Sequence, residues 1–337
     1  MYKFNKLLFM STLIMGTLIA VSSYSWMSMW IGLEINLLSI IPMLSNTSNL
    51  YPSESALKYF VTQALASTIL LFAVITSLNL SEFLAPSSNH FLMMIMNSAL
   101  LTKMGAAPFH AWFPEVMEGL SWINCLIMLT WQKIAPMVLV MYNCQMTLFL
   151  TIIIVFSAAL SAILGLNQIS LRKILAYSSI NHIGWMVGSM LNNQSIWLIY
   201  FLTYSIITIN IIFIFKEANI FYLKQLFNYL NSNKLLKFFF ILNFLSLGGL
   251  PPFLGFFPKW LTINNLILNN FYTMSMILIL FTLITLYFYL RITFSTLIIN
   301  SKEIILTPKK ISLFLIASLN LISLAGLISC TLIFNFF

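Results

Sequence analysis

Aspartate is absent from this chain of 337 residues, and charged residues of all kinds make up only 7% of it. Hydrophobic residues make up 61%, and the mean hydropathy is +0.98. That composition leaves too little polar surface to cover a soluble globule of this size, and apolar runs repeatedly exceed the ~18 residues that span a bilayer. The sequence therefore predicts an integral membrane protein with many helices.

Other absences exclude whole classes of site. Cys125, Cys144 and Cys330 stand alone in apolar segments, without a C-x-x-C pair or a histidine at ligand spacing, so we expect no disulfide, iron–sulfur cluster or zinc. A glycine-rich phosphate loop after a strand is also missing, which argues against an enzyme that binds NADH or quinone itself. Segments such as Thr68–Leu78 and Leu150–Leu160 are apolar on every face, whereas the strands of a membrane β-barrel alternate.

The apolar runs predict an all-α membrane protein with eleven transmembrane helices. Lys3 and Lys6 precede the first run, but no A-x-A-like cleavage site follows, so we expect this helix to be retained rather than removed as a signal peptide. The expected helices cover residues 7–23, 25–45, 57–80, 89–118 (interrupted), 120–143, 147–169, 173–191, 195–216, 238–268 (interrupted), 272–292 and 311–334.

The positive charges test that count. The formal charge is +9, but the basic residues are scattered through short loops, so they indicate membrane topology rather than nucleic-acid binding. With eleven spans, every basic residue outside the apolar runs falls on the face of the N-terminus, which the positive-inside rule makes the side of synthesis, and the C-terminus falls on the opposite face. These residues are Lys3, Lys6, Lys58, Arg172, Lys173, Lys216, Lys224, Lys234, Lys237, Arg291, Lys302, Lys309 and Lys310.

The longest loop, about Glu217–Lys237, contains the amphipathic run Ile220–Leu230. This run can lie on the membrane surface, contact a partner subunit or belong to a solvated linker.

One sequence motif occurs twice. Gly105–Glu115 and Gly249–Lys259 both read G-x-x-P-F-x-x-[WF]-F-P-[EK]. Glycine and proline inside an apolar span interrupt the helix, which is tolerated at membrane depth only where the freed groups face protein or water. The copies lie in the fourth and ninth expected helices, so they enter the membrane from opposite sides, as in inverted-topology repeats. We therefore expect a first repeat over residues 1–145, a second over 146–297 and a C-terminal helix over 298–337.

Four ionisable side chains lie within apolar spans: Glu34, Lys103, Lys133 and Lys259. A charge at membrane depth costs about 3 kcal/mol or more, so we expect all four to be buried and to mark a path for protons or ions. Glu34 must pair with a cation or be protonated, and Lys103 is its expected partner. Because a desolvated lysine can lose its charge and an arginine cannot, Lys133 is a candidate proton carrier. Lys259 either joins this path or extends to the membrane surface.

The histidines and the remaining acids are weaker candidates. His182 lies in a polar stretch of the seventh expected helix and is either a proton relay or a hydrogen-bonded core residue. His110 belongs to the first break motif and is a weak candidate for the same path, whereas His90 lies at a loop edge and should be solvated. Glu115 and Glu118 fall near the N-terminal face, either as surface acids or as the entrance to a path.

Five segments together resemble the mitochondrial NADH dehydrogenase subunit 2 family in its animal form: Gly32–Glu34, Leu101–His110, Leu129–Pro136, Leu175–His182 and Gly248–Phe253. The resemblance covers essentially the whole chain. It implies one of the antiporter-like subunits in the membrane arm of respiratory complex I, in the mitochondrial inner membrane, with the N-terminus in the matrix and the C-terminus in the intermembrane space. The residue usage, which is typical of AT-rich codons, also fits an organelle gene.

The resemblance implies a proton-translocating subunit of NADH:ubiquinone reductase in which Glu34, Lys103, Lys133 and Lys259 occupy the positions of the family's polar axis. It also implies that NADH, FMN, iron–sulfur clusters and ubiquinone bind to other subunits, that this chain holds no cofactor, and that its partners are other membrane-arm subunits and lipids. Two alternatives stay open. One is a cation/proton antiporter component, and the other is a structural scaffold, which would not need four buried charges.

Overall fold

The computed structural model describes residues 2–45, 49–80, 86–230 and 234–298, together with Ser318, Asn320 and Gly326. Within these residues the fold is all-α, and the one β-type pairing is an isolated antiparallel bridge between Ser170 and Tyr222. Apart from these last three residues, the expected helix 311–334 lies outside the described residues. The helices are α1 (Tyr2–Ser22), α2 (Trp26–Leu44), α3 (Leu50–Leu80), α4 (Pro86–Met104), α5 (Trp112–Gly119), α6 (Trp122–Leu129), α7 (Trp131–Tyr142), α8 (Thr147–Gly165), α9 (Leu171–Met190), α10 (Gln194–Ala218), α11 (Leu223–Leu230), α12 (Lys234–Gly248), α13 (Phe256–Leu268) and α14 (Tyr272–Ile298).

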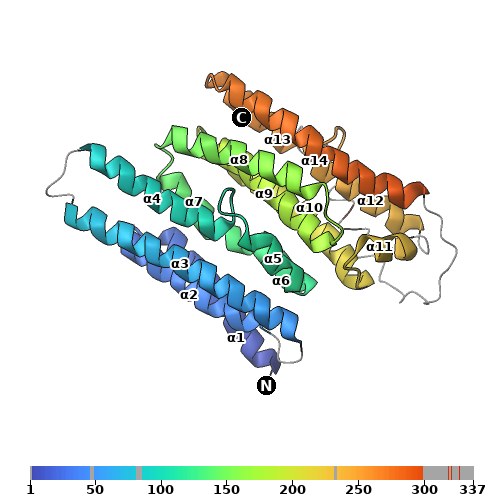
Figure 1. The fold of residues 1–337 in the computed structure, drawn as a ribbon, viewed down its shortest axis with the longest axis horizontal. Coiled ribbons are helices and arrows are strands. Elements are labelled where there is room, and N and C mark those ends of the chain that lie inside the picture. The colour runs from blue at the N-terminus through green and yellow to red at the C-terminus, as the bar shows by residue number, and fades with distance from the viewer. Residues whose placement is uncertain are drawn as a thin grey trace. The chain divides into compact units, whose positions relative to one another are not determined.

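The chain divides into two compact units, Met1–Phe156 and Ser157–Phe337, with the boundary inside α8. In the first unit α2 packs against α1 and α3, and α7 packs against α1, α4 and α6 (Figure 1). In the second unit α10 packs against α9, α12 and α13, and α14 packs against α12 and α13. Each unit is therefore a helical bundle.

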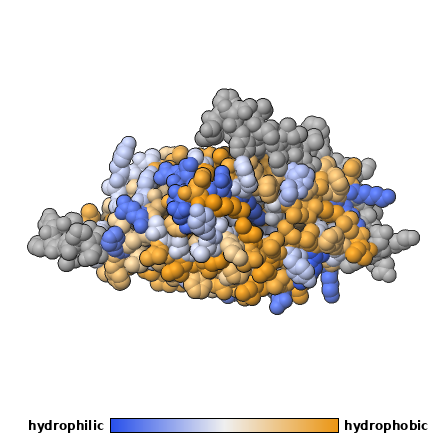
Figure 2. Space-filling model, turned by 90° about the horizontal axis from the view of Figure 1, so that it is seen from above, coloured by the Kyte–Doolittle hydropathy of each residue, from blue (hydrophilic) through white to orange (hydrophobic). Residues whose placement is uncertain are grey.

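Among the residues that the structure describes, seven helical segments are long and apolar enough to cross a membrane. Many of their large apolar side chains point outward, for example Leu18, Phe72 and Leu283, each more than half exposed. Figure 2 shows one face on which such apolar surface is extensive. An outer surface of this kind is stable in lipid rather than in water. The segments are Phe4–Ser22, Trp26–Leu44, Leu50–Leu78, Trp122–Tyr142, Thr147–Gly165, Gln194–Ala218 and Tyr272–Ile298.

The interruptions expected from glycine and proline are present. The run 89–118 is divided into α4 and α5, and the run 238–268 into α12 and α13. A further irregularity was not expected: Thr130 separates α6 from α7. The Thr130 hydroxyl donates a hydrogen bond to the Leu126 carbonyl at 2.7 Å. Pro136 lies within α7 and has no backbone N–H to donate. Threonine back-bonding and proline both bend helices, and here they act one turn to either side of Lys133.

The amphipathic run in the longest loop forms α11. Its side chains Leu226 and Leu230 are buried, and the helix contacts α12 and α14 of its own unit. Lys224 and Gln225 are exposed, and the Gln225 side chain accepts hydrogen bonds from the backbone N–H groups of Phe221 and Tyr222. This segment is thus a short capped helix packed on the second unit.

Candidate functional site

The break between α4 and α5 has a defined backbone geometry. The Gly105 N–H donates to the Thr102 carbonyl at 3.1 Å, and the Ala106 N–H donates to the Leu101 carbonyl at 3.0 Å. This pair of bonds is a Schellman motif, in which the residue after the helix adopts a left-handed conformation. Gly105 has φ +74°, a value that glycine adopts without strain.

The break between α12 and α13 repeats that geometry at the equivalent positions. Gly249 has φ +79°, its N–H donates to the Ser246 carbonyl at 3.0 Å, and the Leu250 N–H donates to the Leu245 carbonyl at 3.3 Å. The peptide bonds Ala107–Pro108 and Pro251–Pro252 are both cis. The two copies of the sequence motif therefore share a local backbone structure.

Lys103, in the last turn of α4, lies inside the first unit with its residue only 6% exposed. Its backbone carbonyl accepts a hydrogen bond from the Gln63 side chain of α3 at 3.2 Å. Lys103 also borders a small polar cavity, lined by Leu33, Asn36, Leu37, Tyr59, Gln63, Lys103, Gln132 and Pro136. Helices α2, α3, α4 and α7 all contribute side chains to it.

Three of the cavity residues form a hydrogen-bonded chain across separate helices. The Tyr59 hydroxyl of α3 donates to Gln132 Oε1 of α7 at 3.3 Å, and Gln132 Nε2 donates to Asn36 Oδ1 of α2 at 2.8 Å. Sequence reasoning did not find these residues as a group. The available signal was the presence of Asn36 and Gln132 close to Glu34 and Lys133 in apolar spans, but their pairing depends on how the helices pack.

Glu34 is partly exposed, so this chain by itself does not bury it as we expected. It lies on the outward stripe of α2 with Met27, Ile31 and Leu38, which are 42%, 44% and 61% exposed. An all-round apolar helix does not reveal from its sequence which face points outward. Glu34 interacts electrostatically with Lys103, but no ion pair within 4.0 Å joins these two described side chains.

Lys133 is the most deeply buried ionisable group named from the sequence, with an exposure of 1%. It lies in the first turn of α7, directly after the irregularity at Thr130. Its Nζ is 5.6 Å from the centroid of the Phe113 ring, which belongs to α5. A ring face stabilises an ammonium by about 2 kcal/mol when the contact is desolvated, without requiring a carboxylate.

Lys259 does not extend to a membrane surface; it is 6% exposed and folds back onto the second break. Its Nζ donates to the Gly248 carbonyl at the end of α12, at 2.8 Å, and lies 5.9 Å from the ring centroid of Trp185. The carboxyl end of a helix carries partial negative charge, which favours a cation there. The equivalent residue of the first motif, Glu115, instead pairs at the surface with Lys58 at 3.2 Å.

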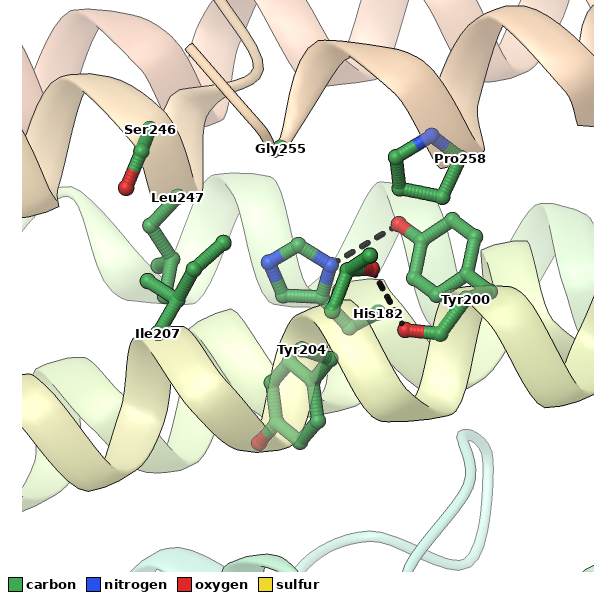
Figure 3. A pocket seen from close by; sticks show the side chains of 9 residues that line it. His182, Tyr200, Tyr204, Ile207, Ser246, Leu247, Gly255 and Pro258 are labelled. Carbon is green, nitrogen blue, oxygen red and sulfur yellow. Dashed lines mark hydrogen bonds between the residues drawn. The ribbon is translucent and has the colours of Figure 1, made fainter. Parts of the chain in front are cut away.

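His182 lies in α9, a helix of which all but three residues are buried, and is itself 5% exposed. Its Nδ1 is 2.9 Å from the Tyr200 hydroxyl, and its ring centroid is 5.0 Å from that of Tyr204. Figure 3 shows the imidazole between Tyr200 and Leu247 in a cavity of the second unit. The cavity residues are His182, Tyr200, Thr203, Tyr204, Ile207, Ser246, Leu247, Gly255 and Pro258.

The remaining candidates lie at the periphery. His110 is partly exposed in the loop after the first break, with Nδ1 3.3 Å from the Pro108 carbonyl, and His90 is exposed. Glu115 belongs to a surface cluster in which Lys58 also contacts Glu54 at 3.1 Å. Among the described residues, no group of three or more His, Cys, Asp and Glu side chains is arranged to hold a metal ion.

The sequence that forms these buried basic groups and paired helix breaks is similar to that of known proteins. Residues 23–285 match the family described as NADH:quinone oxidoreductase/Mrp antiporter, TM. The chain is also 50% identical over 339 aligned positions to NADH-ubiquinone oxidoreductase chain 2 of Aedes aegypti, with 99% of each chain covered. The chain belongs to the NADH:quinone oxidoreductase/Mrp antiporter family. Its likeness to the protein of the same name from Anopheles gambiae is 51% identity, over 90% of this chain and 89% of that one.

The fold is also similar to that of a solved structure. A chain in the structure of respiratory complex I from Thermus thermophilus with bound aureothin is similar with a TM-score of 0.87. The similarity covers 97% of this chain and 78% of that chain, at 23% sequence identity. At that identity the likeness concerns the antiporter-like fold.

Proposed function

We propose that this chain is a proton-translocating membrane subunit of NADH:ubiquinone oxidoreductase, the respiratory complex I. The observation that carries the proposal is the likeness, over nearly the full length, to insect proteins named NADH-ubiquinone oxidoreductase chain 2. The buried Lys103, Lys133 and Lys259 support the translocating role, because ionisable groups at membrane depth are kept chiefly where charge must move.

The proton path in this proposal comprises Glu34, Lys103, Lys133, His182 and Lys259, with His110 as a weaker member. Electron transfer in other subunits changes the interaction of Glu34 with Lys103, and protons then pass through Lys133 and leave past Lys259. Lysine suits this role because it can hold or release a proton in a desolvated interior.

The proposal includes two inverted repeats, over residues 1–145 and 146–297, followed by a C-terminal helix over 298–337, eleven transmembrane helices in all. Its support is the local likeness of the two breaks, which share the same hydrogen bonds and a left-handed glycine at equivalent positions. Each interrupted helix then counts as one span, and α6 and α7 together also count as one span.

The animal relatives and the apolar helices indicate a multi-pass mitochondrial membrane protein. Within the proposal the membrane is the inner one, the N-terminus lies in the matrix and the C-terminus in the intermembrane space, as the one-sided basic residues favour.

Its proposed partners are the other membrane-arm subunits, including the antiporter-like ones, and inner-membrane lipids. Glu34 supports such a neighbour, because a carboxylate on an outward apolar stripe would be costly against lipid alone. NADH, FMN, iron–sulfur clusters and ubiquinone belong to other subunits in this proposal, and this chain carries no redox chemistry.

The second candidate is a component of a cation/proton antiporter, which the description of the family also favours. Two measurements separate the functions. Mitochondria without this chain should lose proton translocation driven by NADH oxidation and regain it when the chain is restored. The purified chain in lipid vesicles should not exchange Na⁺ or K⁺ for protons. Robust exchange by the isolated chain, with unimpaired complex I in its absence, would establish the antiporter instead.

A further inference from the structure

The hydrogen bond between His182 and Tyr200 joins two buried side chains of neighbouring helices. Their residues are 5% and 1% exposed, and the distance from Nδ1 to the hydroxyl oxygen is 2.9 Å. The partner of one ring nitrogen determines which nitrogen carries the proton in the neutral histidine and how the ring is oriented. Tyr200 is therefore placed to control the chemistry of His182.

The opposite edge of the imidazole faces a different element. In Figure 3 the second ring nitrogen lies on the side of Leu247, away from Tyr200. Leu247 and Ser246 belong to the last turn of α12 and line the same cavity as His182. The next residue is Gly248, whose carbonyl accepts the hydrogen bond from Lys259 Nζ.

Two further contacts bring the histidine and the lysine to one region of the second unit. Pro258, which precedes Lys259 in α13, lines the cavity of His182. Trp185, one turn after His182 in α9, has its ring 5.9 Å from Lys259 Nζ. The histidine and the lysine thus lie in one region of the second unit, and the imidazole edge opposite Tyr200 faces Leu247 in the last turn of α12.

We infer that Tyr200 is a positioning residue for His182: its hydroxyl holds Nδ1, so that Nε2 exchanges protons on the side of the α12 end and Lys259. This inference rests on the proposed function and adds to it a residue that no sequence motif singled out. Tyr200 itself neither gains nor loses a proton overall.

The test is Tyr200→Phe in the intact complex, with protons translocated per electron as the readout. The substitution removes one hydroxyl and keeps the ring, so assembly should be retained while the ratio falls. Tyr287→Phe in α14 is the matched control, because it is the same change at a side chain that is 60% exposed, and it should leave the ratio unchanged.

A double-mutant cycle separates positioning from a general packing effect. His182→Gln should lower the ratio, and adding Tyr200→Phe to it should cause no further loss, because Tyr200 acts through His182. Tyr200→His, which returns a hydrogen-bonding group to this position in the form of a ring nitrogen, should pump closer to wild type than Tyr200→Phe. It also decides the matter if Tyr200→Phe does not assemble: a Tyr200→His complex that assembles but pumps as poorly as His182→Gln would contradict the inference.

Two outcomes distinguish a failure of the role of Tyr200 from a failure of the proposed function. A wild-type ratio in Tyr200→Phe, with a reduced ratio in His182→Gln, would overturn the inference and leave the proposed function intact. A wild-type ratio in His182→Gln would remove both residues from the path and again overturn the inference, and the proposed function would then depend on the lysine variants.

Discussion

At the scale of single residues, two of the buried lysines, Lys133 and Lys259, contact groups that accommodate both protonation states. Lys259 donates to a backbone carbonyl, which a neutral amine can also do, and Lys133 lies beside an aromatic ring. Neither contact would leave an unpaired carboxylate in the interior when the proton departs, which is the main penalty of breaking a buried ion pair. These surroundings suit a side chain that gives up and regains its proton.

The hydrogen bonds that link Tyr59, Gln132 and Asn36 lead to a prediction about the stability of the complex. Gln132→Leu should leave a hydroxyl and an amide oxygen in the interior without their partners, at a cost of about 1–3 kcal/mol each. The thermal midpoint of the assembled complex should therefore fall. Gln194→Leu, the same change at an exposed position in α10, should leave the thermal midpoint unchanged. Equal midpoints in the two variants would contradict a structural role for the hydrogen bonds of Gln132.

The surroundings of some single residues could be predicted from the sequence, and those of others could not. The burial of Lys103, Lys133 and Lys259 was predictable, because each interrupts a long apolar run. The exposure of Glu34 was not, since it depends on which face of α2 its neighbours cover. The Tyr200 partner of His182 comes from another helix, and its identity depends on the packing of α9 against α10.

At the scale of elements, the two helix breaks have the same backbone geometry but different side-chain surroundings. The glycine–proline pattern was sufficient to predict both breaks, because φ near +75° and a missing N–H end a helix in any context. The irregularity at Thr130 was not predicted, since a single threonine in an apolar run usually continues the helix.

The surroundings of the two glycines lead to a matched pair of variants. A methyl group at residue 249 would lie 2.7 Å from Lys259 Cδ and 2.9 Å from its Nζ, whereas at residue 105 it would meet the Phe113 side chain at 3.1 Å. Gly249→Ala and Gly105→Ala should each cost about 1–2 kcal/mol in backbone strain. Only Gly249→Ala should displace the amine from the Gly248 carbonyl.

A structure of the Gly249→Ala complex checks this directly through the distance from Lys259 Nζ to Gly248 O. The distance should exceed hydrogen-bonding range in Gly249→Ala and stay near 2.8 Å in Gly105→Ala. An unchanged distance in both variants would show that the glycine is needed only for its backbone conformation.

At the scale of the whole molecule, the proposed topology follows from the one-sided distribution of basic residues. The exposed positions Lys234, at the start of α12, and Asn192, between α9 and α10, should then lie on opposite sides of the membrane. In intact mitoplasts, a thiol reagent that cannot cross the membrane should label Asn192→Cys and spare Lys234→Cys. In inverted vesicles the pattern should reverse, and labelling of both positions from one side would contradict the topology.

The central claim, that buried lysines carry protons through this chain, is tested most directly by protons translocated per NADH oxidised in an assembled Lys133→Met complex. Methionine has similar bulk but cannot be protonated, so the account predicts normal assembly with a reduced ratio. Lys133→Arg should also impair translocation because guanidinium stays charged, whereas Lys234→Met, at an exposed lysine, should not. Full proton translocation in the assembled Lys133→Met complex would contradict the claim and leave Lys133 a structural residue.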